Sequence, residues 1–564
     1  MKISPILKFP FYFLILISLG FQTVKAQVET VPVGHPVYQF LKRMYLQGIL
    51  KNYDDVILPL SQKQVIKDLT KIDSSKAELN SVDKEFLRRM EVKLGMNNNS
   101  KNSAINIFKN FPSQLMENII VDKEKHLYAY QDSSIKFYID PVLNFKYMYS
   151  SKYDNNSTLM DIGGIFRGDY DGWFGFYLEG SNGTQFGNRD VARLDQRAEQ
   201  SFTFNNTKIN FFDGTSGYAR FQKGILSLEL GRERVIWGTG FINKMILSDN
   251  PQLFDFVKFD IAYKKLRYDF LHGWLVQPTT STYVDSLVGN VKSEQPKYVA
   301  ISRLGYQATH KLSFGITQMV IYSNRPLEAA YLNPFLFWES AQRSMNDLDN
   351  TFLTFDGRYL ITNGMELSSS IIFDDINFSR LFKGEWAASN NSTEWQAGTM
   401  LTSPLLPQDF SFIIEYMQAR PYIFSHPGVG EALTYTNNGY LLGTNMQPNS
   451  TRLSTRITYR ATSRLSMQLD YSHTLHGNNI YDSNGDLIKN YGGSVFNNSD
   501  FSEPFYSYLL DGNREISDDF VLGVKYELSY GCYLNFVYEF NKSKMNGTNI
   551  SNNIFWGSVN IDFE

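Results

Sequence analysis

The segment from Val521 to Phe540 reads "VLGVKYELSYGCYLNFVYEF" and alternates between two kinds of side chain. One set is apolar or aromatic and comprises Leu522, Val524, Tyr526, Leu528 and Tyr530. The set between them comprises Gly523, Lys525, Glu527 and Ser529. A period of two predicts a β-strand with one apolar and one polar face. After a tight turn near Gly531 the apolar face continues in Leu534, Phe536, Tyr538 and Phe540, so we expect a β-hairpin.

The polar face of this hairpin separates two classes of β protein. In a soluble sandwich, Lys525 and Glu527 would be costly to bury without partners. In a transmembrane barrel with an apolar outside and a polar inside, such residues are ordinary. The alternation recurs from about Ile135 to the end of the chain. It predicts an antiparallel barrel of about 16–20 strands, with a soluble all-β sandwich as the competing class.

Composition agrees with this class and excludes several others. Aromatic residues make up 15% of the chain, and no apolar run of about 18 residues follows residue 26, which excludes a transmembrane helix. Cys532 is the only cysteine, so no intramolecular disulfide can form. The formal charge is −3 and no basic block occurs, so we expect no nucleic-acid partner.

The first 26 residues have the pattern of a secretory signal peptide. Lys2 and Lys8 form a positive region, and Phe9 to Phe21 ("FPFYFLILISLGF") form a short apolar region. Val24-Lys25-Ala26 is a small-residue cleavage site. We therefore expect an exported protein that is cleaved near Ala26.

Three short amphipathic helices are predicted between residues 35 and 95. The first ends at Gly48, and its apolar stripe is formed by Val37, Phe40, Leu41 and Met44. Ser61 and Gln64 form a capping box at the start of the second helix. Ser81 is the expected N-cap of the third.

These changes of period divide the chain into three parts. Residues 1–26 are the signal peptide, 27–125 form a helical periplasmic or plug region, and 126–564 form the barrel. Three short helices bury little by themselves, so we expect them to pack against the barrel.

One family resemblance emerges from a series of motifs in fixed order. The motifs are "GRERVIWGTG" (231–240), "MILSDNP" (245–251), "AAYLNPFLFW" (329–338), "DLDNTFLTFDGRY" (347–359), "FDDI" (373–376), "RPYIFSH" (420–426), "YTNNGYLLG" and "QPNSTRLS". Together they resemble the Wzi capsule-assembly family in its Bacteroidota form. The resemblance implies an outer-membrane β-barrel of about 18 strands with a small N-terminal helical bundle. It also implies a lectin that holds capsular or other surface polysaccharide at the cell surface, with no catalysis and no cofactor. The expected partners are this polysaccharide, outer-membrane lipid and the barrel insertion machinery.

The stretch after Trp237 breaks the strand pattern. Gly238 and Gly240 let backbone enter space where a side chain would clash. Inside a barrel, irregular backbone is tolerated because it is shielded from lipid. We expect Trp237 to Asn250 to fold inward or over the barrel mouth, either as an internal brace or as part of a sugar-binding surface.

Sugar binding needs aromatic rings for C–H faces, and amides and carboxylates for hydroxyl groups. The candidate residues with this chemistry are Trp237, Ser248, Asp249, Asn250, Asn333, Trp338, Asp349, Asn350, Asp356, Asp374 and Asp375. Alternatively, the acids among them form a lumenal ion network with Arg343, Arg358 or Arg380. No metal is predicted, because the region around Asp349 lacks the glycine and glutamate of a calcium loop.

Two other functions are compatible with the sequence. A polar lumen permits a diffusion channel or porin, although a helical plug would obstruct it. Seven histidines permit a barrel hydrolase that acts on lipid or glycan, although no Gly-x-Ser-x-Gly segment occurs. His473 and His476 would lie on opposite faces of a strand, which disfavours a shared site.

Overall fold

The computed structural model describes residues 28–75, 79–94, 96, 105–106, 123–205, 210–277, 281–285, 289–293, 296–346, 349–376, 382–384, 391–426, 430–498 and 507–563. The predicted signal peptide lies outside the described residues. The division at residues 125 and 126 stays a prediction.

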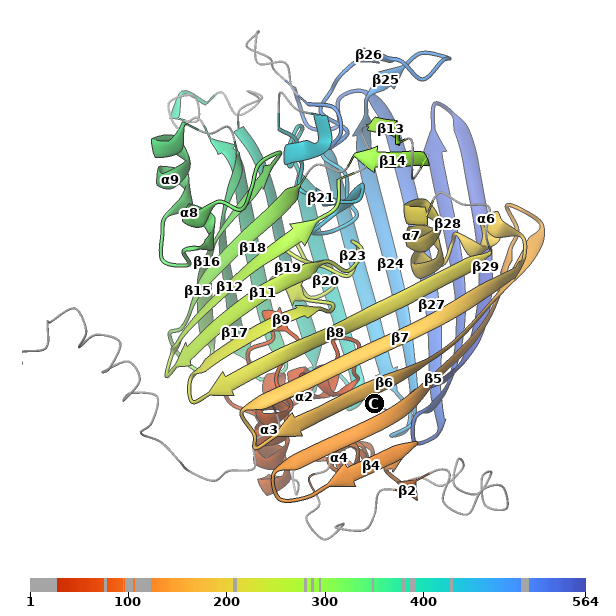
Figure 1. Ribbon diagram of the computed structural model, residues 1–564. Coiled ribbons are helices and arrows are strands. Elements are labelled where there is room, and N and C mark those ends of the chain that lie inside the picture. Colours follow the sequence, from red (N-terminus) through yellow and green to blue (C-terminus); the bar gives the residue numbers. More distant parts are fainter. Residues whose placement is uncertain are drawn as a thin grey trace, which may run out of the picture.

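Eighteen of the described strands pair side by side and close into an antiparallel barrel (Figure 1). They are β5 (Ile135–Ser150), β6 (Asn155–Tyr170), β7 (Phe174–Gly187), β8 (Phe211–Lys223), β9 (Leu226–Arg232), β11 (Asp255–Tyr263), β12 (Leu266–Leu275), β15 (Lys297–Gln307), β16 (Leu312–Ser323), β17 (Asn350–Thr362), β18 (Met365–Ile376), β19 (Asn391–Thr402), β20 (Phe410–Ala419), β23 (Ser450–Arg460), β24 (Leu465–Asn478), β27 (Asn513–Ser529), β28 (Cys532–Met545) and β29 (Thr548–Ile561). The barrel closes between β29 and β5, from Ile554 opposite Ser150 to Ile561 opposite Leu143. The predicted barrel is confirmed, and the soluble sandwich is wrong.

Shorter elements accompany the wall. β4 (Tyr128–Gln131) pairs with the start of β5. Five small pairs are β1 (Ile57–Leu58) with β10 (Ile236–Trp237), β2 (Ile105–Asn106) with β3 (Lys125–His126), β13 (Ser281–Asp285) with β14 (Gly289–Ser293), β21 (Thr436–Asn437) with β22 (Tyr440–Leu441), and β25 (Ile480–Tyr481) with β26 (Leu487–Lys489). The helices are α2 (Val37–Leu46), α3 (Gln62–Ser74), α4 (Ser81–Lys93), α6 (Arg189–Ala192), α7 (Gln196–Asn205), α8 (Ala329–Leu332), α9 (Trp338–Met345) and the 3₁₀ helix η4 (Gly430–Leu433). None of the described helices is long and apolar enough to cross a membrane.

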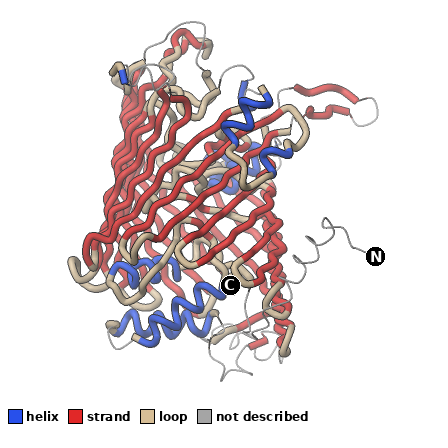
Figure 2. Tube along the Cα trace, turned by 90° about the vertical axis from the view of Figure 1, so that its left-hand side faces the viewer, coloured by secondary structure: helices blue, strands red, loops and turns tan. Residues whose placement is uncertain are grey.

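The two ends of the barrel differ in their connections. Short turns join β8 to β9, β11 to β12 and β27 to β28 at one end, whereas long segments join β12 to β15, β16 to β17, β20 to β23 and β24 to β27 at the other. Helices α2, α3 and α4 gather at the short-turn end, at the bottom of Figures 1 and 2. There the Tyr45 hydroxyl donates to the carbonyl oxygen of His310 at 3.2 Å. Short turns face the periplasm in outer-membrane barrels, so the helices mark the periplasmic end.

The three predicted helices are confirmed, with one correction. Helix α2 ends two residues before Gly48, which has a left-handed φ of 81°. Ser61 caps α3 by accepting from the backbone N–H of Gln64. The N-cap of α4 is Asn80 and not Ser81, because the Asn80 side chain accepts from the backbone N–H of Asp83. A shared apolar core joins the helices to Leu360, Met400 and Ile413 of the wall.

The predicted apolar-out, polar-in rule holds for the C-terminal hairpin. Inward-facing Glu527 of β27 forms ion pairs with Arg89 at 3.0 Å and with Lys93 at 2.8 Å, both on α4. On the other face, Leu528 and Phe536 are exposed. Glu527 of this hairpin therefore finds its partners on α4, one of the three N-terminal helices α2, α3 and α4 that we name the helical plug.

The same rule fails on β12, β15 and β16. Inward-facing Leu271, Ile301 and Met319 are fully or almost fully buried in an apolar core inside the barrel. The other side of this core is formed by segments that fold inward, including Met245 to Leu247. Part of the lumen is therefore a protein core and not a water-filled space.

Candidate functional site

Residues 237–250, the inner segment, leave the wall after β9 and return to it at β11. Strand β10 pairs with β1, so that Trp237 lies opposite Ile57. The backbone N–H of Trp237 donates to the carbonyl oxygen of Leu247 at 2.8 Å, and Leu247 returns the bond at 3.0 Å. The N–H of Gly238 donates to the carbonyl oxygen of Val56 at 2.9 Å. The inner segment is thus an inward hairpin joined to the N-terminal region.

Two glycines permit this path. Gly238 has a φ of 143°, which side chains rarely allow, and a Cβ at Gly240 would overlap the carbonyl oxygen of Asn243. The backbone can approach itself this closely only without a side chain. The predicted clash is confirmed at Gly240, whereas at Gly238 a Cβ would come no closer than 3.5 Å to another atom and the constraint is the positive φ.

Charged side chains hold the bend of the inner segment. The Glu415 carboxylate, from β20, accepts the backbone N–H of Phe241 at 2.7 Å and that of Asn243 at 2.8 Å. The ammonium of Lys244 donates to the carbonyl oxygens of Gly238 and Gly240. Burial, together with nearby Arg358, lowers the pKa of Lys244 to about 8. These bonds satisfy backbone groups that would otherwise be unpaired inside the barrel.

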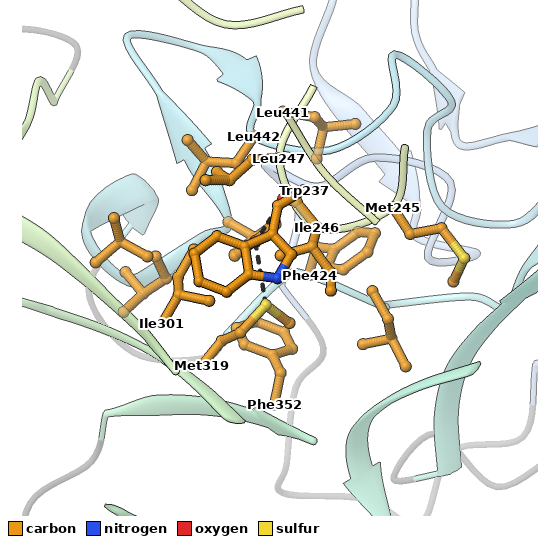
Figure 3. Close-up of a cluster of buried hydrophobic side chains, with 14 of the residues drawn as sticks. Trp237, Met245, Ile246, Leu247, Ile301, Met319, Phe352, Phe424, Leu441 and Leu442 are labelled. Atoms are coloured by element: carbon orange, nitrogen blue, oxygen red, sulfur yellow. Dashed lines mark hydrogen bonds between the residues drawn. The ribbon is translucent and has the colours of Figure 1, made fainter. Parts of the chain in front are cut away.

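The indole ring of Trp237 lies at the centre of the internal core (Figure 3). Its exposed fraction is 0%, and the core around it includes Ile301, Met319, Phe352 and Phe424. This position gives the ring no open face on which a sugar could stack. Trp237 therefore braces the inner segment, and a sugar-contacting role would require the core to open.

The far end of the inner segment carries a network that we name the amide cluster. Its members are Gln196, Gln200, Asn250, Gln252, Asn437 and Asn438. The Gln196 amide donates to the carbonyl oxygens of Asp249 and Asn250, both at 2.8 Å. The Gln200 amide donates to the carbonyl oxygen of Asn250 at 2.8 Å, and the Asn438 amide donates to Gln252 Oε1 at 3.1 Å. The cluster joins α7, the inner segment and the β21–β22 turn.

The amide cluster lies at the long-loop end of the barrel. The backbone N–H of Asn438 donates to the carbonyl oxygen of Val276, which follows β12 at that end. Asp249 and Gln196 are exposed there, whereas Ser248 is buried and donates to the carbonyl oxygen of Gly443. Planar amides beside an exposed carboxylate offer the donors and acceptors that sugar hydroxyl groups require.

A second polar space lies in the periplasmic half of the lumen. This cavity of about 570 Å³ is lined by α2, the inner segment and strands β23 to β29. Ion pairs and hydrogen bonds cross its wall, such as Arg456 with Asp470 at 2.6 Å and the Trp556 Nε1–H with Glu539 at 2.9 Å. Within the described part of the chain, no three His, Cys, Asp or Glu side chains could share a metal ion.

A family model described as capsule assembly protein Wzi matches residues 168–487. The chain belongs to this family. It is an outer-membrane β-barrel. No curated protein matches the sequence.

Among the solved structures that are similar to this Wzi family member, Escherichia coli Wzi shares its fold. The Escherichia coli Wzi structure has a TM-score of 0.56 at 12% identity and covers 95% of this chain and 99% of its own. It is described as an outer-membrane protein involved in Group 1 capsule assembly and as a carbohydrate-binding β-barrel. OprD of Pseudomonas aeruginosa has a TM-score of 0.40 at 11% identity, covering 75% of this chain and 94% of its own. OpdK of the same organism, with vanillate, has 0.44 at 10% identity, covering 75% and 98%.

The structure divides the predicted site residues of this family member into separate places. Trp237, Ser248, Asp249 and Asn250 lie on the inner segment. Asn350 is buried and donates to the carbonyl oxygen of Leu433 at 3.0 Å. Asn333 and Trp338 lie outside the barrel wall, with Trp338 buried against it. The residues do not form one site, and sugar binding by each of them stays a prediction.

The acidic candidates take part in hydrogen bonds and ion pairs. Asp356 pairs with Arg303 at 2.6 Å, and Asp349 pairs with Arg325 at 2.6 Å. Asp374 accepts the backbone N–H of Phe424 at 2.7 Å. The side chain of Asp375 lies outside the described part of the structure. The alternative prediction, that these acids form ion pairs, is thus confirmed for Asp349 and Asp356.

Its predicted arginine partners are wrong. Arg343 pairs with Glu339, and Arg358 pairs with Asp55. Arg380 lies outside the described residues. Arg358 and Asp55 come from segments that are distant in the sequence, which spacing alone does not reveal, whereas Arg343 and Glu339 lie four residues apart on α9.

Sequence reasoning missed most of the amide cluster. Gln196 and Gln200 lie on α7, inside a long loop between strands, where no periodic pattern marks them. Asn437 and Asn438 belong to the motif "YTNNGYLLG", whose paired amides were the one available signal.

Proposed function

We propose that this protein binds surface polysaccharide at its extracellular mouth and holds it to the cell, as a lectin and not as an enzyme. Membership of the Wzi family supports a role in capsule assembly. The shared fold with Escherichia coli Wzi, a carbohydrate-binding barrel by description, supports a glycan as the partner. Further proposed partners are outer-membrane lipid and the insertion machinery, which would recognise the aromatic last strand.

The observation that carries the proposal is the rigid mounting of the amide cluster. The inner segment beneath it is fixed by the internal core and by Glu415. A binding group held in place loses little conformational entropy when a ligand arrives. Exposed Asp249 and Gln196 at the edge of this support are suited to hydroxyl groups of a sugar chain.

The channel alternative is less well supported. The internal core fills the lumen beside β12, β15 and β16, and the helical plug lies at the periplasmic end. Solute passage would require at least one of these packed regions to move.

The hydrolase alternative also finds little support. Ser450 Oγ lies 3.2 Å from His476 Nδ1, but Ser450 is fully buried and also contacts the carbonyl oxygen of Pro448. His473 lies on the opposite face of β24, next to Asp518 at 2.8 Å. A substrate cannot reach the buried hydroxyl group in this arrangement.

Replacement of Asp249 and Gln196 by alanine tests the proposal. Each lost hydrogen bond to a ligand is worth about 1 kcal/mol, so the double variant should bind the cell's own purified polysaccharide roughly ten- to thirtyfold more weakly. In cells, shed polysaccharide per folded barrel should rise. Asp486→Ala, an exposed acid in the β25–β26 turn, is the matched control and should change neither quantity.

Trp237→Ala distinguishes binding from folding in the same assay. Loss of a fully buried indole should reduce the amount of folded barrel. The shed polysaccharide per folded barrel should rise less than in the Asp249/Gln196 double variant, because Trp237 contacts no ligand directly. If the Asp249/Gln196 double variant leaves both binding and this ratio unchanged, the mouth is not the glycan site.

A further inference from the structure

The segment that joins β16 to β17 folds back over the outside of the barrel wall. Its helices α8 and α9 lie outside the wall (Figure 1). Tyr331 of α8 and Trp338 of α9 belong to a buried cluster with side chains of the wall. The wall side chains of this cluster are Phe270, Tyr298, Ala300, Val320 and Tyr322. They alternate along β12, β15 and β16 with Leu271, Val299, Ile301, Met319 and Ile321 of the internal core. Because strand side chains alternate between faces, the Tyr331–Trp338 cluster lies on the outer face.

This segment also covers polar side chains of the outer face. The Gln318 amide donates to Ser302 Oγ at 3.0 Å and to the carbonyl oxygen of Leu336 at 2.8 Å. The backbone N–H of Trp338 donates to Gln318 Oε1 at 3.2 Å. An outward glutamine on a lipid-facing wall would be costly without such partners. The segment therefore covers a partly polar region of the wall, and its own outer surface faces the surroundings there.

That outer surface is strongly apolar. The sequence Leu332-Asn-Pro-Phe-Leu-Phe337 exposes four large apolar side chains, and the exposed fraction reaches 75% at Phe335 and 54% at Phe337. One short stretch with this many exposed aromatic and aliphatic side chains marks an interaction surface.

The apolar surface is continuous with the apolar outer wall of the barrel. The Phe335 ring stacks on Tyr268 with 5.6 Å between centroids. Tyr268 lies opposite Leu304, and Leu304 lies opposite Ile316, so the three form one row across β12, β15 and β16. Leu304 and Ile316 are exposed on the outer face, where a transmembrane barrel meets lipid.

We propose that residues 332–337 form a lipid-contacting lobe, in which Leu332, Phe335, Leu336 and Phe337 lie among acyl chains of the membrane. The lobe widens the apolar belt of the barrel on one side, and Phe335 meets the wall at Tyr268, near the start of β12. The Glu339–Arg343 ion pair on α9, at 2.6 Å, lies on the polar side of the lobe. This inference is independent of glycan binding.

Spin labels on single cysteines test the lobe in liposomes of phosphatidylcholine and phosphatidylglycerol. Cys532 is the only cysteine, so Cys532→Ser gives the background for Phe335→Cys. Leu304→Cys is the lipid-facing control, and Ile488→Cys, on the exposed β26, is the water-facing control. The label at position 335 should match that at 304, with high collision rates with oxygen and at least fivefold protection from a water-soluble nickel complex.

Two outcomes would overturn the proposal. Nickel accessibility equal to that at position 488 would place the lobe in water. Protection from both reagents that disappears on dilution into excess lipid would assign the surface to a second copy of the chain.

A second measurement avoids the cysteine background. Phe335→Asp with Phe337→Asp should lower the temperature at which the barrel unfolds in these liposomes by several degrees, whereas Ile488→Asp should not. Equal temperatures for both variants would also count against the lobe.

Discussion

Asp55 connects three parts of the chain at one carboxylate. It pairs with Arg358 of β17 and lies 3.5 Å from Lys42 of α2. Arg358 also donates to the carbonyl oxygen of Thr239 in the inner segment at 3.2 Å. Burial alone would raise the pKa of Asp55, but Arg358, Lys42 and Lys244 hold it well below its usual range. The charged form therefore stabilises the docking of the N-terminal region.

Asp55→Asn should destabilise the folded barrel at neutral pH by about 3 kcal/mol, because Arg358 would lose its partner in a buried place. A carboxyl with a lowered folded pKa contributes stability above its unfolded pKa of about 4 and loses that contribution as the pH falls further. The difference between variant and parent should therefore shrink below about pH 4.

The measurement is the thermal midpoint of unfolding in detergent between pH 3 and pH 8. Asp54→Asn is the control with a smaller expected effect, since the Asp54 carboxylate is 3.7 Å from Arg267 and more exposed. A constant Asp55→Asn deficit across this range would show that the charge of Asp55 is not what stabilises the contact.

At the scale of elements, the helical plug is held to the barrel by both charge and apolar packing. Lys42 of α2 pairs with Glu366 of β18 at 2.5 Å, while Arg89 and Lys93 of α4 pair with Glu527. Leu360, Met400 and Ile413 complete the apolar contact. Residues of α2 and Phe86 of α4 line the polar cavity on this side.

Deletion of residues 28–94 should raise the conductance of the barrel in planar bilayers severalfold, because the cavity of about 570 Å³ would open to the periplasm. Deletion of residues 480–489, the β25–β26 hairpin at the other end, should leave the conductance unchanged. If the plug deletion also has no effect, the inner segment and its core close the barrel by themselves.

In the whole molecule, β29 pairs with β5, so that the first and last strands of the described wall have no open edge. Closed barrels stay folded in detergent, so an unheated sample should migrate faster than a boiled one on a gel. Because the wall spans the membrane, the protein should also fractionate with the outer membrane. A chain that ends before β29, at residue 547, should lose the fast band. Recovery of the full chain from the soluble periplasm would contradict a membrane barrel.

Local patterns in the sequence predicted the class of fold and the positions of the three N-terminal helices. Three local features could be predicted: the two faces of the C-terminal hairpin, the helix cap at Ser61 and the close backbone approach at the glycines of the inner segment. Each depends on residues that lie only a few positions apart in the sequence, so residue spacing is enough to predict it. The family was predicted from a different signal, the order of motifs along the chain.

Which apolar faces point inward, and which segments cover them, became clear only from the folded barrel. In β15 every residue from Lys297 to Arg303 is buried, because the internal core covers one face and Tyr331 with Trp338 cover the other. A strand that is buried on both faces does not alternate between apolar and polar residues, so its sequence does not indicate which face points into the barrel. The ion-pair partners of Asp55, Asp349 and Asp356 could not be predicted from the sequence either, because an ion pair depends on distance in space. The chain brings these residues and their partners together only when the barrel closes.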